Sequence, residues 1–242
     1  MDATPPSMPP PDAPPPVIPD MSHEAPSPAV VDKPLLRGVL HQVAAVVAVV
    51  AGTVLAVTSP SHKGTLSAVF FTLSLVTLFT VSATYHRITW SPKARAIMRR
   101  ADHASIFILI AGTYTPIAIA ALPEGTGQHI LLVVWCGALV GVLQSLFWIH
   151  APKAVAAIIA VALGWVVVIY WKEATAALLP LELGCVFAGG VAYTIGALAY
   201  AFKRPVLWPK WFGYHEFFHA FTLVGATLHF VGIASMIGRS VD

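Results

Sequence analysis

His215 and His219 have the spacing of two ligands to one metal ion. They lie four residues apart in the segment HEFFH, and side chains at i and i+4 of a helix share one face with about 6 Å between them. His86, at the end of an earlier apolar segment, can supply a third nitrogen. Three neutral imidazoles leave the fourth tetrahedral position of Zn²⁺ open for water, an arrangement typical of catalytic zinc. We therefore expect Zn²⁺ bound by His86, His215 and His219.

Asp102 and Ser82 are the polar side chains that would complete such a site. Asp102 opens the third apolar segment, where its carboxylate can accept a proton from the water or orient it. Ser82 precedes His86 by four residues and shares its helix face, so its hydroxyl can bind that water or a substrate carbonyl. The alternative for Ser82 is a structural hydrogen bond within the bundle. The alternative for the three histidines is a group of interfacial imidazoles without a metal.

His229 lies further along the same segment. It is 14 residues beyond His215, which is about 21 Å along a helix axis at the usual rise per residue. This is too far to share the metal, so we expect His229 to make a buried hydrogen bond between helices. His103 follows Asp102 and points about 100° away from it around the helix, so we expect an interfacial residue.

The composition shows which kind of protein carries these residues. Of the 242 residues, 57% are hydrophobic and only 10% are charged, and the mean hydropathy is +0.77. Soluble domains carry roughly 25% charged residues. The composition therefore argues against a soluble enzyme or a nucleic-acid-binding protein, despite the net charge of +3. The expected partner is a membrane lipid, as substrate or ligand, and the expected location is the plasma membrane.

Seven apolar runs of about 20 residues without internal charge predict membrane-spanning helices. We therefore expect an all-α integral membrane protein, with a seven-helix transmembrane domain over residues 33–242. Residues 1–32 contain eleven prolines and are predicted to form a disordered cytoplasmic tail. The predicted spans lie near residues 39–58, 65–85, 104–122, 130–149, 154–171, 183–202 and 214–237.

The positive charges predict the orientation of the bundle. With seven spans drawn, eleven of the 14 lysines and arginines fall on the side of the N-terminus and three on the other side. Positive charge accumulates in cytoplasmic loops, which places the N-terminus in the cytoplasm and the C-terminus outside. An even number of helices would lose this asymmetry. The eleven residues are Lys33, Arg37, Arg87, Lys93, Arg95, Arg99, Arg100, Lys153, Lys203, Arg204 and Lys210.

From about residue 33 onward the chain resembles the hemolysin III family, the bacterial branch of the progestin and adiponectin receptor superfamily. The motifs that carry the resemblance are SATYHR (82–87), RRADHASIFILIAGTYTP (99–116), HEFFHAFTLVGATLHF (215–230) and RGVLH (37–41). The resemblance implies seven helices with a cytoplasmic N-terminus. It also implies zinc bound by the three histidines, with Asp102 and Ser82 beside it.

The chain departs from the family pattern before the first span. The family commonly shows an acid and an asparagine ahead of a histidine there. In this chain His41 matches, but Arg37 stands four residues earlier and Lys33 or Pro34 stands where the acid would be.

The leading functional hypothesis is a zinc-dependent hydrolase of a lipid amide or ester with a role in membrane lipid homeostasis, by analogy with the ceramidase-related superfamily. One alternative is a receptor or stress-signalling membrane protein in which zinc is structural.

Two further alternatives follow from the family name and from the segment HEFFH. A cytolysin would need a continuous polar pore lining, whereas the fourth to sixth spans offer little beyond Gln144, Ser145, Tyr193 and Thr194. HEFFH also fits the His-Glu-x-x-His pattern of metalloproteases, with Glu216 as general base. An intramembrane protease would need an acidic ligand downstream, and Asp242 is the only acid after His219. We therefore expect Glu216 to face Lys210 or solvent.

Overall fold

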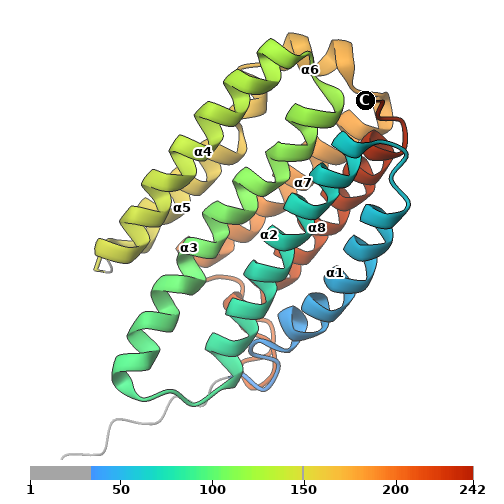
Figure 1. Cartoon of the computed structure of the whole chain (residues 1–242). Coiled ribbons are helices and arrows are strands. Elements are labelled where there is room, and N and C mark those ends of the chain that lie inside the picture. The colour runs from blue at the N-terminus through green and yellow to red at the C-terminus, as the bar shows by residue number, and fades with distance from the viewer. Residues whose placement is uncertain (1–33, 149, 242) are drawn as a thin grey trace, which may run out of the picture. The chain divides into compact units, whose positions relative to one another are not determined.

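A computed structural model describes residues 34–148 and 150–241 of the chain, and this part is helical and contains no β-strand (Figure 1). The predicted tail of residues 1–32 lies outside the described residues. Short helical turns, Ile117–Ala121 and Val166–Val168, follow α3 and α5. The helices are α1 (Val39–Val57), α2 (His62–Arg87), α3 (Pro92–Pro116), α4 (Glu124–Phe147), α5 (Lys153–Gly164), α6 (Trp171–Ala177), α7 (Pro180–Phe202) and α8 (Tyr214–Gly238).

The helix lengths and compositions confirm an all-α membrane protein. Six of the described helical segments are long and apolar enough to cross a membrane. A bent pair, α5 with its 3-10 turn followed by α6, makes a seventh if it is counted as one span. The sequence predicted seven spans, and the described residues contain six, or seven if the bent pair crosses the membrane as one span.

The fifth predicted span, residues 154–171, is not one continuous α-helix, because α5 ends at Gly164 and a 3-10 turn follows. The segment Ala154–Val168 is bent by 58° relative to the next helical segment, Trp171–Ala177. The Tyr114 hydroxyl donates to the Gly164 carbonyl at 2.7 Å and accepts from the Val167 amide at 2.9 Å. Interrupted backbone in a membrane requires such partners, so a side chain from α3 stabilises the change from α5 to the 3-10 turn.

The third span begins earlier than predicted. Ser91 accepts a hydrogen bond from the Ala94 amide and caps α3, with Pro92 in the first turn. The predicted start near residue 104 was wrong because the charge-free run begins there, while the helix itself extends through a basic segment at its N-terminal end. Asp102 consequently lies well inside α3 and is buried, whereas the sequence placed it at the opening of the helix.

Two apolar cores hold the helices together. One lies among α3, α4 and α5 and includes Phe107, Val134 and Leu163. The other lies among α1, α2 and α8 and includes Phe71 and Ile233. The most extensive helix contacts join α7 to α8, α1 to α2 and α2 to α3. This arrangement brings the C-terminal end of α2 next to the N-terminal end of α8.

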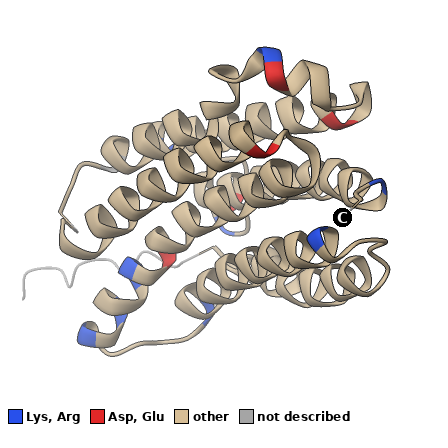
Figure 2. Ribbon diagram, turned by 45° about the horizontal axis from the view of Figure 1, so that its top comes forward, with Lys and Arg blue, Asp and Glu red and all other residues tan. Residues whose placement is uncertain are grey.

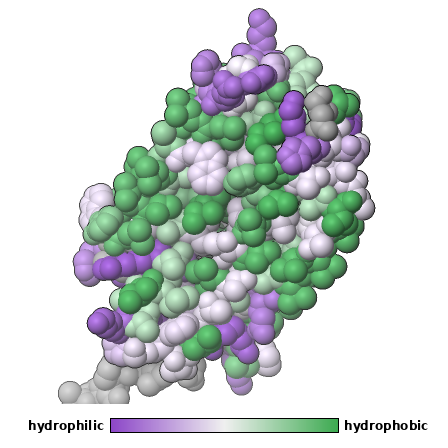
Figure 3. Space-filling model, viewed as in Figure 1, coloured by the Kyte–Doolittle hydropathy of each residue, from purple (hydrophilic) through white to green (hydrophobic). Residues whose placement is uncertain are grey.

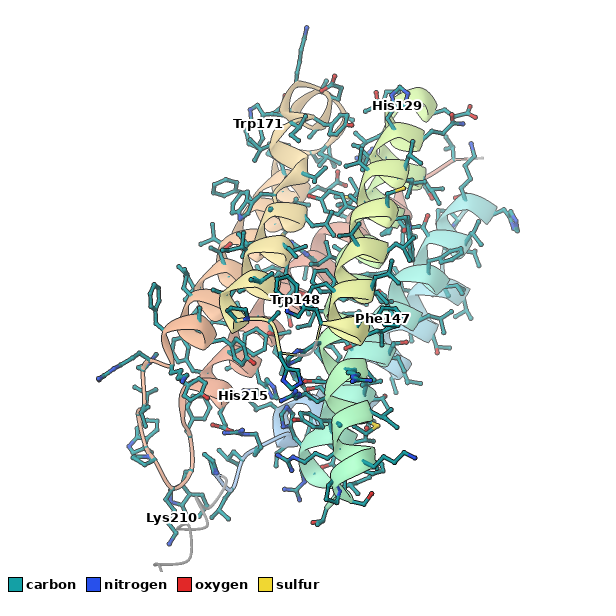
Figure 4. The ribbon with its side chains drawn as sticks, turned by 90° about the vertical axis from the view of Figure 1, so that its left-hand side faces the viewer. His129, Phe147, Trp148, Trp171, Lys210 and His215 are labelled. Carbon is teal, nitrogen blue, oxygen red and sulfur yellow. The ribbon has the colours of Figure 1, made fainter. Side chains whose placement is uncertain are left out.

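The outside of the bundle is apolar, as a lipid-facing surface must be. On α1, Val46, Val50 and Val57 are 65%, 61% and 75% exposed. Figure 3 shows hydrophobic side chains over most of the visible face and hydrophilic ones mainly toward its two ends. Exposed aromatic side chains, Phe147 and Trp148, mark the end of α4 (Figure 4), as expected near a membrane interface.

Charged residues are concentrated near helix ends and in the connections (Figure 2). The basic N-terminal part of α3 and the loop between α7 and α8 lie at the same end of the bundle (Figure 1). The side of the membrane that this end faces remains a prediction from the charge distribution.

Candidate metal centre and adjoining cavity

Three histidines converge between α2 and α8. His86 lies in the last turn of α2, while His215 and His219 lie in the first two turns of α8. The Nε2 atoms of His86 and His215 are 3.0 Å apart, and one ring nitrogen from each of the three lies within 4.8 Å of the others. In Figure 4, His215 points into the bundle, away from Lys210 in the loop. Separations of this size and three imidazole donors fit one zinc ion.

Glu216 fixes the helix turn that carries two of these histidines. Its Oε2 accepts from the Gly213 amide at 2.8 Å, which satisfies one free donor at the start of α8. Its Oε1 accepts from the Arg37 guanidinium, and its side chain is fully buried. The expectation that Glu216 faces Lys210 or solvent was therefore wrong. Both carboxylate oxygens are engaged, which also argues against Glu216 as a general base.

Gly38 allows the start of α1 to approach the site. It has a left-handed backbone conformation with φ of +81°, which glycine adopts at little cost. A Cβ atom at this position would lie 2.8 Å from Cβ of His86. The absence of a side chain thus lets α1 begin directly against the end of α2.

Asp102 and Ser82 lie beside the histidines, as the sequence predicted. Asp102 Oδ2 is 3.9 Å from Nε2 of His86, which is beyond hydrogen-bond range. The Ser82 hydroxyl hydrogen-bonds the Asp102 carboxyl, and both residues are buried. The carboxylate is therefore held next to the histidine nitrogens. The metal-ligand and catalytic roles of these residues remain predictions.

His41 is a fourth histidine of this group, which the sequence offered only as a match to a family motif. Its ring is stacked on that of His219, with centroids 3.9 Å apart and planes 11° apart, and it also contacts Phe79. A signal was available, because His41 begins a span at the same end as His86. Stacking restricts the orientation of the His219 ring.

A mainly apolar cavity of about 150 Å³ runs from the histidines into the bundle between α3, α5, α7 and α8. Ser82, Asp102 and His219 border one end, and Trp165 and His229 lie toward the other. Since one water needs about 10 to 15 Å³ by this measure, there is room for about ten to fifteen heavy atoms, which corresponds to part of a lipid chain. His103, expected at the interface, also lines this cavity.

Comparison with known proteins decides the family. The family model described as haemolysin-III related matches residues 30–230. The chain belongs to the haemolysin III family. Hemolysin-3 of Bacillus cereus is 27% identical over 203 residues, which cover 83% of this chain and 90% of that protein. The hemolysin-3 homolog of Bacillus subtilis (strain 168) is 31% identical over 160 residues, 66% of this chain and 72% of that protein.

Membership of this family agrees with the resemblance seen in the sequence, including its place in the progestin and adiponectin receptor superfamily. Together with the apolar helices, it establishes a multi-pass protein of the cell membrane. All three histidines of the candidate metal centre fall inside the matched range.

Proposed function

We propose that the protein is a zinc-dependent hydrolase of a lipid amide or ester, with a role in membrane lipid homeostasis. The observation that carries the proposal is the convergence of three imidazole nitrogens within 4.8 Å, beside a buried carboxylate, at one end of an apolar cavity. When bound, zinc supplies a Lewis acid that polarises a carbonyl and lowers the pKa of a coordinated water.

Different residues of the chain bind the metal, transfer the proton and orient the reacting groups. His86, His215 and His219 hold the metal. Asp102 accepts the proton of the attacking water, and its burial keeps bulk solvent away from that proton transfer. Ser82 orients the Asp102 carboxyl through its hydrogen bond. The apolar cavity holds part of the lipid chain, so that the scissile carbonyl lies at the histidine end.

Purified protein tests the proposal directly. Its zinc content is measured by mass spectrometry, and it is incubated with amide-linked and ester-linked lipids in detergent. Removal of zinc by a chelator should abolish turnover, and added Zn²⁺ should restore it. Protein that holds zinc but releases no fatty acid from any lipid of a broad panel would overturn the hydrolase.

A receptor or stress-signalling protein with structural zinc is the second candidate. The three histidines come from α2 and α8, so one ion would join two helices that are distant in sequence. In that case zinc would raise thermal stability without supporting turnover, and the same preparations distinguish the two functions.

The names of the relatives refer to hemolysis, which is a form of cytolysis. A pore requires a polar path, whereas the cavity of this protein has a mainly apolar lining. The cavity therefore does not favour cytolysis. Release of a dye from liposomes at a controlled ratio of protein to lipid tests it. Dye release that scales with the protein would favour a pore over both zinc functions.

A further inference from the structure

Tyr193 and His229 form a second polar site within the cavity, away from the histidine cluster. Tyr193 lies on α7 and His229 on α8, with ring centroids 5.4 Å apart, and both line the cavity. The Tyr193 hydroxyl and Nδ1 of His229 are shielded from solvent, and neither has a hydrogen-bond partner among the described residues. Unpaired buried polar atoms are costly, so the two groups are expected to bind a partner other than the residues that the structure describes.

Two glycines make room for these rings. A Cβ at Gly189 would lie 2.3 Å from Cδ2 of His229, and a Cβ at Gly225 would lie 2.7 Å from Cε2 of Tyr193. Each ring therefore occupies the space of a missing side chain on the facing helix. This close packing holds the two polar groups at fixed positions.

The hydrogen bond of His229 defines what the site can bind. Nε2 lies 3.1 Å from the Val186 carbonyl oxygen, which can only accept, so Nε2 carries the proton. This bond between α8 and α7 confirms the prediction for His229. Burial in an apolar cavity disfavours a charged ring, which leaves Nδ1 as an acceptor. Beside it, the Tyr193 hydroxyl can donate.

We propose that Tyr193 and His229 bind a hydroxyl group carried partway along the chain of the ligand. A hydroxyl donates to Nδ1 of His229 and accepts from Tyr193, whereas an ester or ketone oxygen cannot donate and a methylene can do neither. His229 lies ten residues beyond His219 on α8, about 15 Å along the axis. The ligand is therefore a long-chain amphiphile with one polar group at the histidine cluster and a hydroxyl well down its chain. This inference rests on the proposed function, since it assumes that a lipid chain occupies the cavity.

Binding of two matched fatty acids to the purified full-length protein tests the site. The probes are octadecanoic acid and the same acid with a hydroxyl midway along the chain. The wild-type protein should bind the hydroxylated acid about fivefold to tenfold more tightly, the worth of one or two hydrogen bonds in a buried site. Tyr193→Phe should remove this preference and leave the affinity for octadecanoic acid unchanged. His229→Gln, which keeps a donor within reach of Val186, should reduce the preference as well.

Tyr200→Phe is the matched control. Tyr200 also lines the cavity, but its ring lies beside His215, with centroids 5.6 Å apart, so the preference should persist. The thermal stability of Tyr193→Phe should be at or above the wild-type level, because the substitution removes a buried hydroxyl that has no partner among the described residues.

The outcomes separate the two proposals. Equal affinity of wild-type protein for both acids would mean that water alone fills the site, which overturns the hydroxyl site and leaves the hydrolase standing. Binding of neither acid would overturn the hydroxyl site, and turnover of amide-linked and ester-linked lipids would decide the hydrolase separately. A preference that survives Tyr193→Phe and His229→Gln would assign hydroxyl recognition to other residues.

Discussion

The Arg37 guanidinium donates to the buried carboxylate of Glu216, 179 residues further along the chain. This ion pair joins the segment before α1 to the first turn of α8, the turn that also carries His215. Two backbone hydrogen bonds run beside it, from Leu35 to Lys210 and from Leu36 to Trp211. The start of the membrane domain thus supports the helix that presents two of the three site histidines.

Arg37→Ala should destabilise the protein, because it leaves the fully buried Glu216 without its cation. Loss of one partner of a buried pair costs about 3 kcal/mol. The melting temperature in detergent should therefore fall by several degrees. Arg37→Lys should lose less, because it keeps the charge. An Arg37→Ala variant with the melting temperature of the wild-type protein would show that the ion pair contributes nothing to stability.

The purified protein should contain about one zinc per chain. His86→Ala, His215→Ala and His219→Ala should each lose the metal and the thermal stabilisation that binding to the folded state provides. Elemental analysis and melting curves with and without added Zn²⁺ measure both effects. His129→Ala, at the opposite end of the bundle, is the control and should retain zinc. Full occupancy in a His215→Ala, His219→Ala double variant would rule out this ligand set.

Asp102→Asn separates a catalytic role from a structural one. The amide keeps the size of the carboxyl and its contact with Ser82 but cannot accept the proton, so zinc should remain while turnover falls about 10² to 10⁴-fold. Ser82→Ala should have a smaller effect because it removes only an orienting hydrogen bond. An Asp102→Asn variant with wild-type turnover would leave the hydrolase in place and assign its base to another group.

Reporter fusions should locate the two ends of the bundle. Fusions at Gly125, before the main body of α4, and after Asp242 should both report the outer face, and a fusion in the 203–213 loop should report the cytoplasm. The reason is the excess of lysine and arginine on one side. A cytoplasmic signal at Gly125 would reverse the orientation. A cytoplasmic signal only after Asp242 would mean that the bent α5–α6 pair does not cross the membrane.

The sequence predicted the bounds of a span well where an apolar run and the helix have the same length. The first span was predicted as residues 39–58 and is Val39–Val57, and the last was predicted as 214–237 and is Tyr214–Gly238. Hydropathy failed at α3, because a basic helix can continue past the apolar run. It failed again at Gly164, where α5 changes into a 3-10 turn, because local composition does not reveal a hydrogen bond from Tyr114 on another helix.

The candidate site was predictable in part for a similar reason. Helical spacing placed His215 beside His219, and the direction of each span placed His86 at the same end. Spacing could not reveal the partner of Glu216, since that partner lies 179 residues away and a single charge near a helix end looks the same whether it meets solvent or a buried cation. The stacking of His41 on His219 likewise depends on how closely Gly38 lets α1 approach.

The division of the histidines between α2 and α8 has a consequence for biosynthesis. His86 and His215 are separated by 129 residues, so a chain still emerging from the ribosome has one member of the triad in the membrane long before the other two are made. The cluster can assemble only when α8 inserts against α2. If the protein binds zinc as proposed, loading of the ion is therefore a late event in biogenesis, and a chain that stalls before α8 presents only one of the three proposed ligands.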